Sequence, residues 1–105
     1  MADKRRSKLV FEREGETVEF KLDQSPLTIG RAKGCDVVLP DTSVSRCHAE
    51  LRLIDDVWYV VEVSAKNGTF LNKQEVKQSP LVSGDELHFG TVCVTFLTEH
   101  AGSQV

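Results

Sequence analysis

The sequence predicts an all-β fold, built as an antiparallel sandwich or barrel. In several segments apolar residues recur at every second position, which is the pattern of a strand with one buried face. Clusters of Gly, Pro, Asn, Asp and Ser separate these segments at intervals of about 8–12 residues, a spacing typical of short strands joined by turns. Because no stretch has convincing helical periodicity, we expect two packed sheets or one closed sheet.

The alternation is clearest in three segments, 17–22, 48–53 and 91–96. A fourth segment, 57–63 (VWYVVEV), is apolar on both sides, which predicts a strand covered on two faces or paired deep in a sheet. The residues predicted to point inward from the three alternating segments are Val18, Phe20, Leu22, Ala49, Leu51, Leu53, Val92, Val94 and Phe96.

Turn-forming residues mark the connections between these strands. Gly15 lies in REGET, where it can take the positive φ of a tight hairpin. Pro26 begins the next predicted strand. Gly90 shifts the alternation by one residue, which indicates a tight turn or a bulge.

Composition limits the class of protein. The chain has 105 residues, which suits one domain, and its 40% apolar and 28% charged residues allow a core without metal or disulfide. A net charge of −3 disfavours bulk attraction to nucleic acid or to an anionic membrane. No apolar run approaches the roughly 20 residues of a membrane span, and no signal peptide is recognised. We therefore expect a soluble, cytoplasmic protein.

The cysteines favour buried structural thiols over a disulfide framework, because they are odd in number and widely spaced. Their spacing also disfavours a zinc site, and we predict no metal and no cofactor. The ligands of such a site would be Cys35, Cys47, His48 and Cys93.

The sequence gives little support to two catalytic interpretations or to nucleotide binding. Ser45 and His48 could form a nucleophile and a base, but the serine lies in no G-x-S-x-G turn. Cys47 and His48 are neighbours in a strand-like segment, so their side chains point to opposite faces. The loop 30–36 (GRAKGCD) lacks the Lys and Ser or Thr that complete a Walker A loop. We therefore predict that the protein is not an enzyme.

Four motifs in order are more informative than any one of them. They are IGR at 29–31, SVSRCHAEL at 43–51, WYVVEVSAKNGTFLN at 58–72 and LVSGDELHFG at 81–90. Their order and spacing resemble the forkhead-associated (FHA) domain. The resemblance covers about residues 8–98, and we expect residues 1–7 and 99–105 to be flexible tails.

The resemblance implies an FHA/SMAD-like β-sandwich of about eleven strands, whose loops at one end bind phosphothreonine peptides. Arg31 matches the family arginine that contacts phosphate, and Ser45 matches the serine that donates to it. Arg46 falls where the family often has a polar or basic phosphate contact. Asn67 matches the asparagine that holds the peptide backbone. The positions that match architectural residues of the loops are Gly30, His48, Gly68 and Thr69.

Three positions depart from the family pattern. Lys66 stands where many members have a small or hydroxyl residue, and we predict that it adds a contact to phosphate or to an acidic side chain. Glu62 replaces the usual Asp. Lys73 replaces the glycine expected after Asn72, so that turn must be of a different type or strained.

These residue types suit a phosphorylated ligand. A phosphothreonine carries about −1.5 to −2 charge and three acceptor oxygens, and guanidinium presents a planar fork that matches phosphate. We therefore predict a module that binds phosphothreonine-containing protein segments produced by an upstream Ser/Thr kinase, without nucleic acid, membrane or small-molecule cofactor. The alternative is a phosphate-independent interaction or assembly module.

Overall fold

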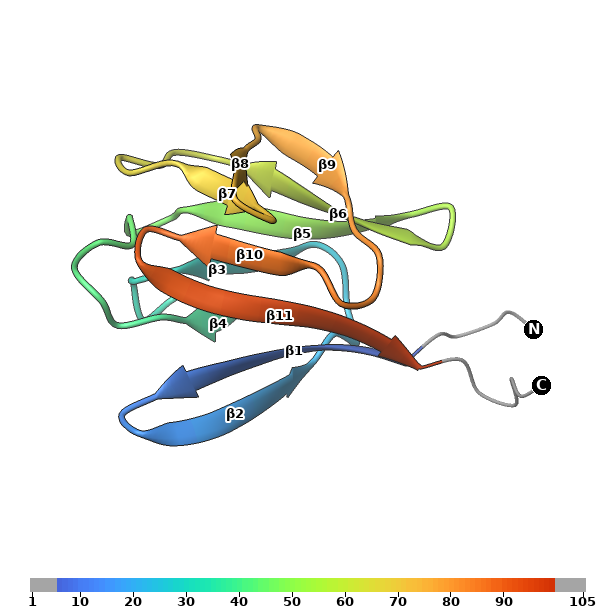
Figure 1. Cartoon of the computed structure of the whole chain (residues 1–105), viewed down its shortest axis with the longest axis horizontal. Coiled ribbons are helices and arrows are strands. Elements are labelled where there is room, and N and C mark those ends of the chain that lie inside the picture. Colours follow the sequence, from blue (N-terminus) through green and yellow to red (C-terminus); the bar gives the residue numbers. More distant parts are fainter. Residues whose placement is uncertain (1–5, 100–105) are drawn as a thin grey trace.

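The computed structural model describes residues 6–99, which form eleven strands and no helix (Figure 1). The strands are β1 (Arg6–Arg13), β2 (Glu16–Lys21), β3 (Leu27–Gly30), β4 (Val37–Val38), β5 (Ala49–Ile54), β6 (Val57–Glu62), β7 (Thr69–Leu71), β8 (Gln74–Glu75), β9 (Gln78–Pro80), β10 (Glu86–Phe89) and β11 (Val92–Glu99). The all-β prediction is confirmed. In this part of the chain there is no helix long and apolar enough to cross a membrane.

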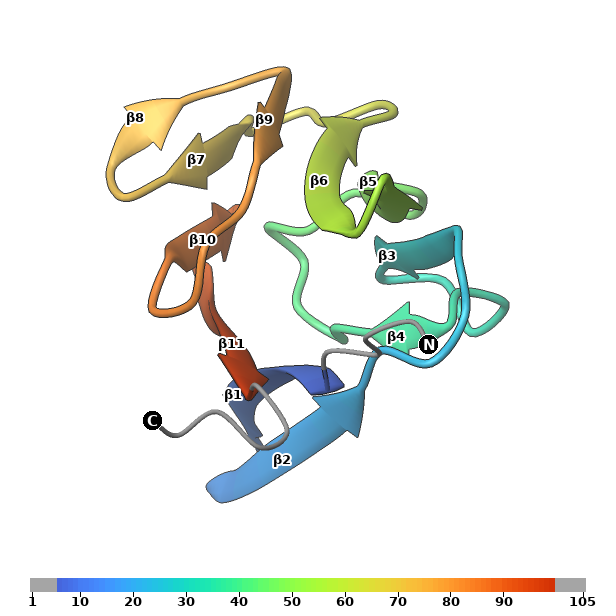
Figure 2. The same cartoon turned by 90° about the vertical axis from the view of Figure 1, so that its right-hand side faces the viewer.

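The strands form two sheets that face each other as a sandwich (Figure 2). The six-stranded sheet has the order β2-β1-β11-β10-β7-β8, and the five-stranded sheet has the order β4-β3-β5-β6-β9. Every pair is antiparallel except β3 with β4, which is parallel. The structure therefore decides between the two architectures that alternation left open.

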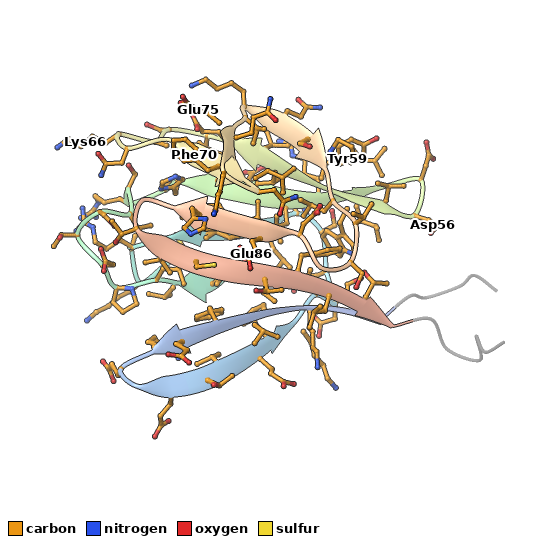
Figure 3. The ribbon with its side chains drawn as sticks, in the orientation of Figure 1. Asp56, Tyr59, Lys66, Phe70, Glu75 and Glu86 are labelled. Carbon is orange, nitrogen blue, oxygen red and sulfur yellow. The ribbon has the colours of Figure 1, made fainter. Side chains whose placement is uncertain are left out.

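Side chains from the inner faces of both sheets form one core, and Figure 3 shows them between the ribbons. Leu51 and Val60, which pair across β5 and β6, are fully buried, as are Leu87 and Val94 across β10 and β11. Burying such side chains contributes about 1.5–3 kcal/mol each. The alternation of apolar residues in the sequence is therefore the signal of this core.

One expectation about the strands is wrong, and another holds in only one of its two alternatives. Leu53 points along the inner face, but it is 44% exposed because it lies at the end of the β5–β6 hairpin, beyond the facing sheet. Segment 57–63 was expected to be covered on two faces or paired deep in a sheet. It is not covered on both faces, since Trp58 is buried but Tyr59 is half-buried and Val63 is 53% exposed, whereas β6 is paired on both edges, with β5 and with β9.

Several turns contain residues with positive φ, both glycines and other residue types. Glu14 and Gly15 both have positive φ in the β1–β2 hairpin, and Gly90 has a φ of 64° in the turn between β10 and β11. Asn72 (49°) and Lys73 (74°) both lie in the left-handed region. The β7–β8 turn therefore places a lysine in a conformation that favours glycine, and it is strained.

The ends of the domain differ slightly from the predicted limits. β1 begins at Arg6 and β11 ends at Glu99, and the two strands pair from one end to the other (Arg6 with Glu99). The remainder of the predicted tails, residues 1–5 and 100–105, lies outside the described residues.

The fold brings several connections together at one end of the sandwich. These are the segments 31–36, 39–48 and 63–68, together with the β10–β11 turn (Figure 1). The β5–β6 hairpin lies at the other end, as the positions of Lys66 and Asp56 show (Figure 3).

Candidate functional site

A depression of about 400 Å³ lies among the loops at this end of the sandwich. Its lining comes from Arg31 in the first loop, from residues 42–47 in the second, and from Ser64, Lys66 and Asn67 in the third. Residues separated by more than thirty positions in the chain thus surround one volume.

The first loop is held against the second by the backbone. The nitrogen of Arg31 donates to the Ser45 carbonyl (3.0 Å) and that of Ala32 donates to the Arg46 carbonyl (3.2 Å). Gly30 makes this approach possible, because a Cβ atom there would lie 2.1 Å from the Arg46 carbonyl oxygen. The loops can therefore touch only if residue 30 is glycine.

Arg31 uses one guanidinium nitrogen to fix its own direction. Its Nε donates to the carbonyl of Val44 (3.0 Å), while the side chain is exposed at the depression. Nη1 and Nη2 carry four further N–H groups, which is the fork that binds a phosphate or a carboxylate with two hydrogen bonds. The guanidinium is therefore oriented before any ligand arrives.

The second loop begins with a turn closed by Asp41. The carboxylate accepts from the nitrogen (2.9 Å) and the hydroxyl (2.6 Å) of Ser43, and these hydrogen bonds hold the pKa of Asp41 below its ordinary value. Ser43 also accepts from the nitrogen of Thr91 (2.9 Å), in the turn after Gly90. Val44 is buried in the core. The loop is thus anchored on both sides of residue 43.

Ser45 stands at the centre of the hydrogen bonds that shape the site. Its nitrogen donates to Nδ1 of His48 (3.2 Å), and its hydroxyl oxygen accepts from the nitrogen of Lys66 (2.8 Å). A hydroxyl can donate one hydrogen, and the Ser45 hydroxyl acts only as an acceptor towards Lys66. It can therefore give that hydrogen to an acceptor in the depression.

His48 connects the second loop to the third through hydrogen bonds of its ring. The ring is fully buried, Nδ1 accepts from Ser45, and Nε2 therefore carries the hydrogen that it donates to the Gly68 carbonyl (3.0 Å). Its edge packs against Phe89 with 5.3 Å between ring centroids. Burial lowers the pKa of His48, opposed by the hydrogen bond to Gly68 and by the charge of Glu62. The ring is therefore a neutral brace.

The third loop is bound to the second by Asn67. Its Nδ2 donates to the carbonyl of Ser43 (2.9 Å), which leaves a second N–H and the amide oxygen for a ligand. Gly68 has a φ of 84°, and Thr69 is buried at the start of β7. The exposed Lys66 adds a third cation to those of Arg31 and Arg46 around the depression.

The remaining motif residues hold the scaffold. Nδ2 of Asn72 donates to the Asp85 carboxylate (3.0 Å), whose second oxygen accepts from the nitrogen of Val82 (2.9 Å). The Asn72 amide oxygen accepts from the nitrogen of Glu86. Asp85 is buried, so these hydrogen bonds satisfy its carboxylate and join the β7–β8 turn to the start of β10.

The structure brings the predicted contact residues together and also adds others. All of them line the depression: Arg31, Ser45, Arg46, Lys66 and Asn67. Sequence reasoning missed Thr42 and Ser43, which lie in the same lining. The available signal was Asp41, because an aspartate two residues before a serine is typical of a side-chain-closed turn.

Two further expectations meet the geometry here. Cys35 is buried as expected, but Cys47 and Cys93 are exposed, so the prediction of three buried thiols is wrong for those two. Cys47 lines the depression and Cys93 lies on the outer face of the six-stranded sheet, so neither side chain enters the core. In His48, both ring nitrogens are already engaged by backbone groups, so the ring cannot take a proton from Ser45.

Permanent cations, a hydroxyl with a hydrogen free to donate and a side-chain amide surround one depression, and this combination suits an anionic group. The protein is a β-sandwich that carries this arrangement on the loops at one end. The FHA domain model matches residues 27–90, more than half of the chain, and the chain therefore belongs to the FHA domain family. The resemblance seen in the four motifs is confirmed.

Named relatives agree with this assignment. The chain is 42% identical over 79 residues to the glycogen accumulation regulator GarA of Mycobacterium tuberculosis (strain ATCC 25618 / H37Rv). It is 41% identical over 78 residues to the oxoglutarate dehydrogenase inhibitor of Corynebacterium jeikeium (strain K411). These matches cover 75% and 74% of this chain but 49% and 54% of the relatives. The chain thus spans about half the length of the curated relatives it matches.

Solved structures of FHA domains share the fold. One comes from a structural and functional study of phosphothreonine-dependent FHA domain interactions, with a TM-score of 0.80, 28% identity, and coverage of 90% of this chain and 97% of that one. Another is the FhaA FHA domain complexed with the intracellular domain of Rv3910, with a TM-score of 0.77, 30% identity, and coverage of 86% and 98%. FHA domains bind phosphothreonine peptides, and the family points to a binding module rather than an enzyme.

Proposed function

We propose that this protein binds phosphothreonine-containing segments of a partner protein at the depression and acts by recruitment. The observation that supports the proposal most strongly is the convergence of Arg31, Ser45 and Arg46 on one volume, with Ser45 positioned by the buried His48. Each loop is held by hydrogen bonds within the protein, so little ordering of the site is required when a ligand binds.

The roles follow from the chemistry of each group. Arg31 binds two phosphate oxygens through its guanidinium, and the Ser45 hydroxyl donates to the third. Arg46 and Lys66 add positive charge at the rim. Asn67 uses its remaining N–H and its amide oxygen to hold the peptide backbone next to the phosphothreonine.

The expected affinity follows from these contacts. Hydrogen bonds to charged groups contribute roughly 1.5–3 kcal/mol each. Three or four of them, less the cost of ordering a flexible peptide, leave about 8 kcal/mol, which corresponds to a low micromolar Kd. Such an affinity suits a contact that a kinase makes and a phosphatase removes.

The partner is therefore the product of a Ser/Thr kinase, and the module carries no chemistry of its own. Two relatives are named as a regulator and as an inhibitor. We propose a comparable regulatory role here, in which the phosphorylated state of a protein decides whether this module docks onto it.

The test is a titration with a degenerate peptide library that has one central phosphothreonine, and with the same library unphosphorylated. We expect binding of the phosphorylated library alone. Arg31→Ala should weaken it by at least about tenfold, because one bidentate contact is worth more than 1.4 kcal/mol. Lys33→Ala is the matched control, an exposed cation of the same loop outside the lining. Equal affinities of wild type and Arg31→Ala would refute the proposal.

One observation favours a second candidate, phosphate-independent assembly. Leu53, Ile54 and Val57 are 44%, 47% and 37% exposed at the tip of the β5–β6 hairpin, at the end opposite the depression. Clustered apolar exposure is typical of protein contacts. Binding of an unphosphorylated partner that survives Arg31→Ala and is lost in Ile54→Asp would favour this function over the first.

A further inference from the structure

Two cysteines lie next to each other where the first two loops meet. Cys35 closes the turn of the first loop, where its nitrogen donates to the carbonyl of Ala32 (3.1 Å). Its thiol is buried and donates to the carbonyl oxygen of Arg46 (3.2 Å). Cys47 is the residue after Arg46, is exposed and lines the depression.

Covalent geometry limits the distance between the two side chains. Within a planar peptide unit, the carbonyl oxygen of one residue lies about 2.8 Å from the next Cα. The Cys35 sulfur, 3.2 Å from the Arg46 oxygen, is thus at most about 6 Å from the Cα of Cys47. A disulfide joins Cα atoms about 4.4–6.8 Å apart through sulfurs about 2.05 Å apart. Forming the bond therefore requires rotation of the exposed Cys47 side chain and a movement of its loop that brings the two sulfurs together.

The pKa of Cys35 agrees with this proximity. Burial raises it, and the neighbouring Cys47 thiol raises it further. The space for the buried thiol exists because residue 30 is glycine, since a Cβ there would lie 2.9 Å from the Cys35 sulfur. The Cys35 sulfur therefore lies between the two loops, in space that the absence of a side chain at Gly30 leaves open.

We propose that Cys35 and Cys47 form a reversible disulfide that weakens ligand binding at the depression, an inference that rests on the proposed function for its effect on the ligand. The oxidant is a peroxide. The Cys47 sulfur breaks the O–O bond and becomes a sulfenic acid with release of water, and the Cys35 sulfur then displaces the hydroxyl as a second water. Two thiols and one hydrogen peroxide give one disulfide and two waters.

The bond acts on the site through the loop. It removes the thiol hydrogen bond to the Arg46 carbonyl and draws Cys47 toward the first loop. Cys47 lies between Arg46, which faces the depression, and His48, which positions Ser45. A displacement of Cys47 moves the Arg46 guanidinium, and through His48 the Ser45 hydroxyl, away from the positions in which both can contact one phosphate.

Cys93 is the third cysteine, and it is replaced in the background used for all measurements. It is exposed and pairs with His88 across β10 and β11, on the sheet opposite the one that carries the first two loops. Its substitution, Cys93→Ser, removes one of the two exposed thiols and leaves Cys35 and Cys47 in place, while high dilution limits disulfides between the Cys47 thiols of two molecules. All measurements use the full chain in this background.

The first measurement is chemical. After mild peroxide treatment at high dilution, we expect the intact mass to fall by two hydrogen atoms, and peptide mapping to join the peptides that contain Cys35 and Cys47. Dithiothreitol should reverse the change. A protein that gains oxygen atoms without joining these peptides, or that does not react, overturns the proposal.

The second measurement is the affinity for the phosphothreonine library. We expect the disulfide form to bind at least about tenfold more weakly than the reduced form, since loss of one hydrogen bond to a charged group has this effect. In Cys35→Ser and in Cys47→Ser, peroxide and dithiothreitol treatments should give the same affinity. Equal binding by the reduced and disulfide forms overturns the regulatory effect. A reduced protein that binds no phosphopeptide instead refutes the proposed function, while the mapping result still decides whether the bond forms.

Discussion

Replacement of His48 by alanine should destabilise the whole domain, not only the site. The substitution leaves two backbone groups without their partners, the Ser45 nitrogen and the Gly68 carbonyl. The buried Gly68 carbonyl that loses its hydrogen bond costs about 1–3 kcal/mol, and the part-buried Ser45 nitrogen costs about 1 kcal/mol, at the low end of this range. The volume vacated beside Phe89 adds about 1 kcal/mol. Together these give a loss of about 3–5 kcal/mol in the free energy of unfolding, from a total of about 5–15 kcal/mol for a domain of this size.

Urea unfolding at pH 7.5, followed by Trp58 fluorescence, measures this loss. His88→Ala is the control, because His88 is half-buried on the outer face of the six-stranded sheet and pairs with Phe70 and Cys93. We expect this control to lie within about 1 kcal/mol of wild type. A loss below about 1 kcal/mol for His48→Ala, or equal losses for the two variants, would refute the conclusion that the ring braces the loops.

Three other predictions concern pH and backbone. Because burial lowers the pKa of His48, its contribution to stability is full above the ordinary value of about 6.5. This contribution is lost as pH falls below 6.5 toward the lowered pKa of the folded protein. Between pH 7.5 and 5, the urea midpoint should therefore fall less in His48→Gln than in wild type. Gly30→Ala should lower the free energy of unfolding by about 3 kcal/mol in thermal or urea unfolding, because its Cβ would lie 2.1 Å from the Arg46 carbonyl oxygen. The control Gly34→Ala, where a Cβ meets open space, should change it by under about 1 kcal/mol. Lys73→Gly should stabilise by about 0.5–1 kcal/mol, because Lys73 has a φ of 74°; a lower melting temperature would contradict the assignment of strain.

The arrangement of the site explains why its parts are spread over the chain. The Ser45 hydroxyl is positioned by the backbone of Lys66, and the carbonyl of Ser43 by the side chain of Asn67. Neither contact exists until the third loop has packed against the second. The proposed binding at the depression therefore depends on the complete sandwich, and variants that loosen the core should lose affinity before they unfold.

Local patterns in the sequence determined the all-β class, and the motifs predicted which loops carry the site. Period-2 alternation predicts strands because one face of each strand must be buried, and the four motifs predict the family. Gly30 and Gly68 were recognisable as loop residues because they match architectural positions of the family motifs, and the structure adds the reason, a clash for any Cβ at residue 30 and a positive φ at residue 68. The prediction that Arg31 and Asn67 contact a ligand rests on their chemistry, which suits a phosphopeptide, and on their order, which matches the family.

Only the tertiary structure decided how these residues meet. The contact of Ser43 with Thr91 spans 48 positions, and no local pattern in the sequence encodes such a pair. The exposure of Leu53 and of Cys47 depends on where the opposing sheet and loops end, and the approach of Cys35 to Arg46 depends on the packing of two loops against Gly30. Alternation and turn propensity act between near neighbours, whereas burial and contact are properties of the packed whole, because they are set by residues far away in the chain.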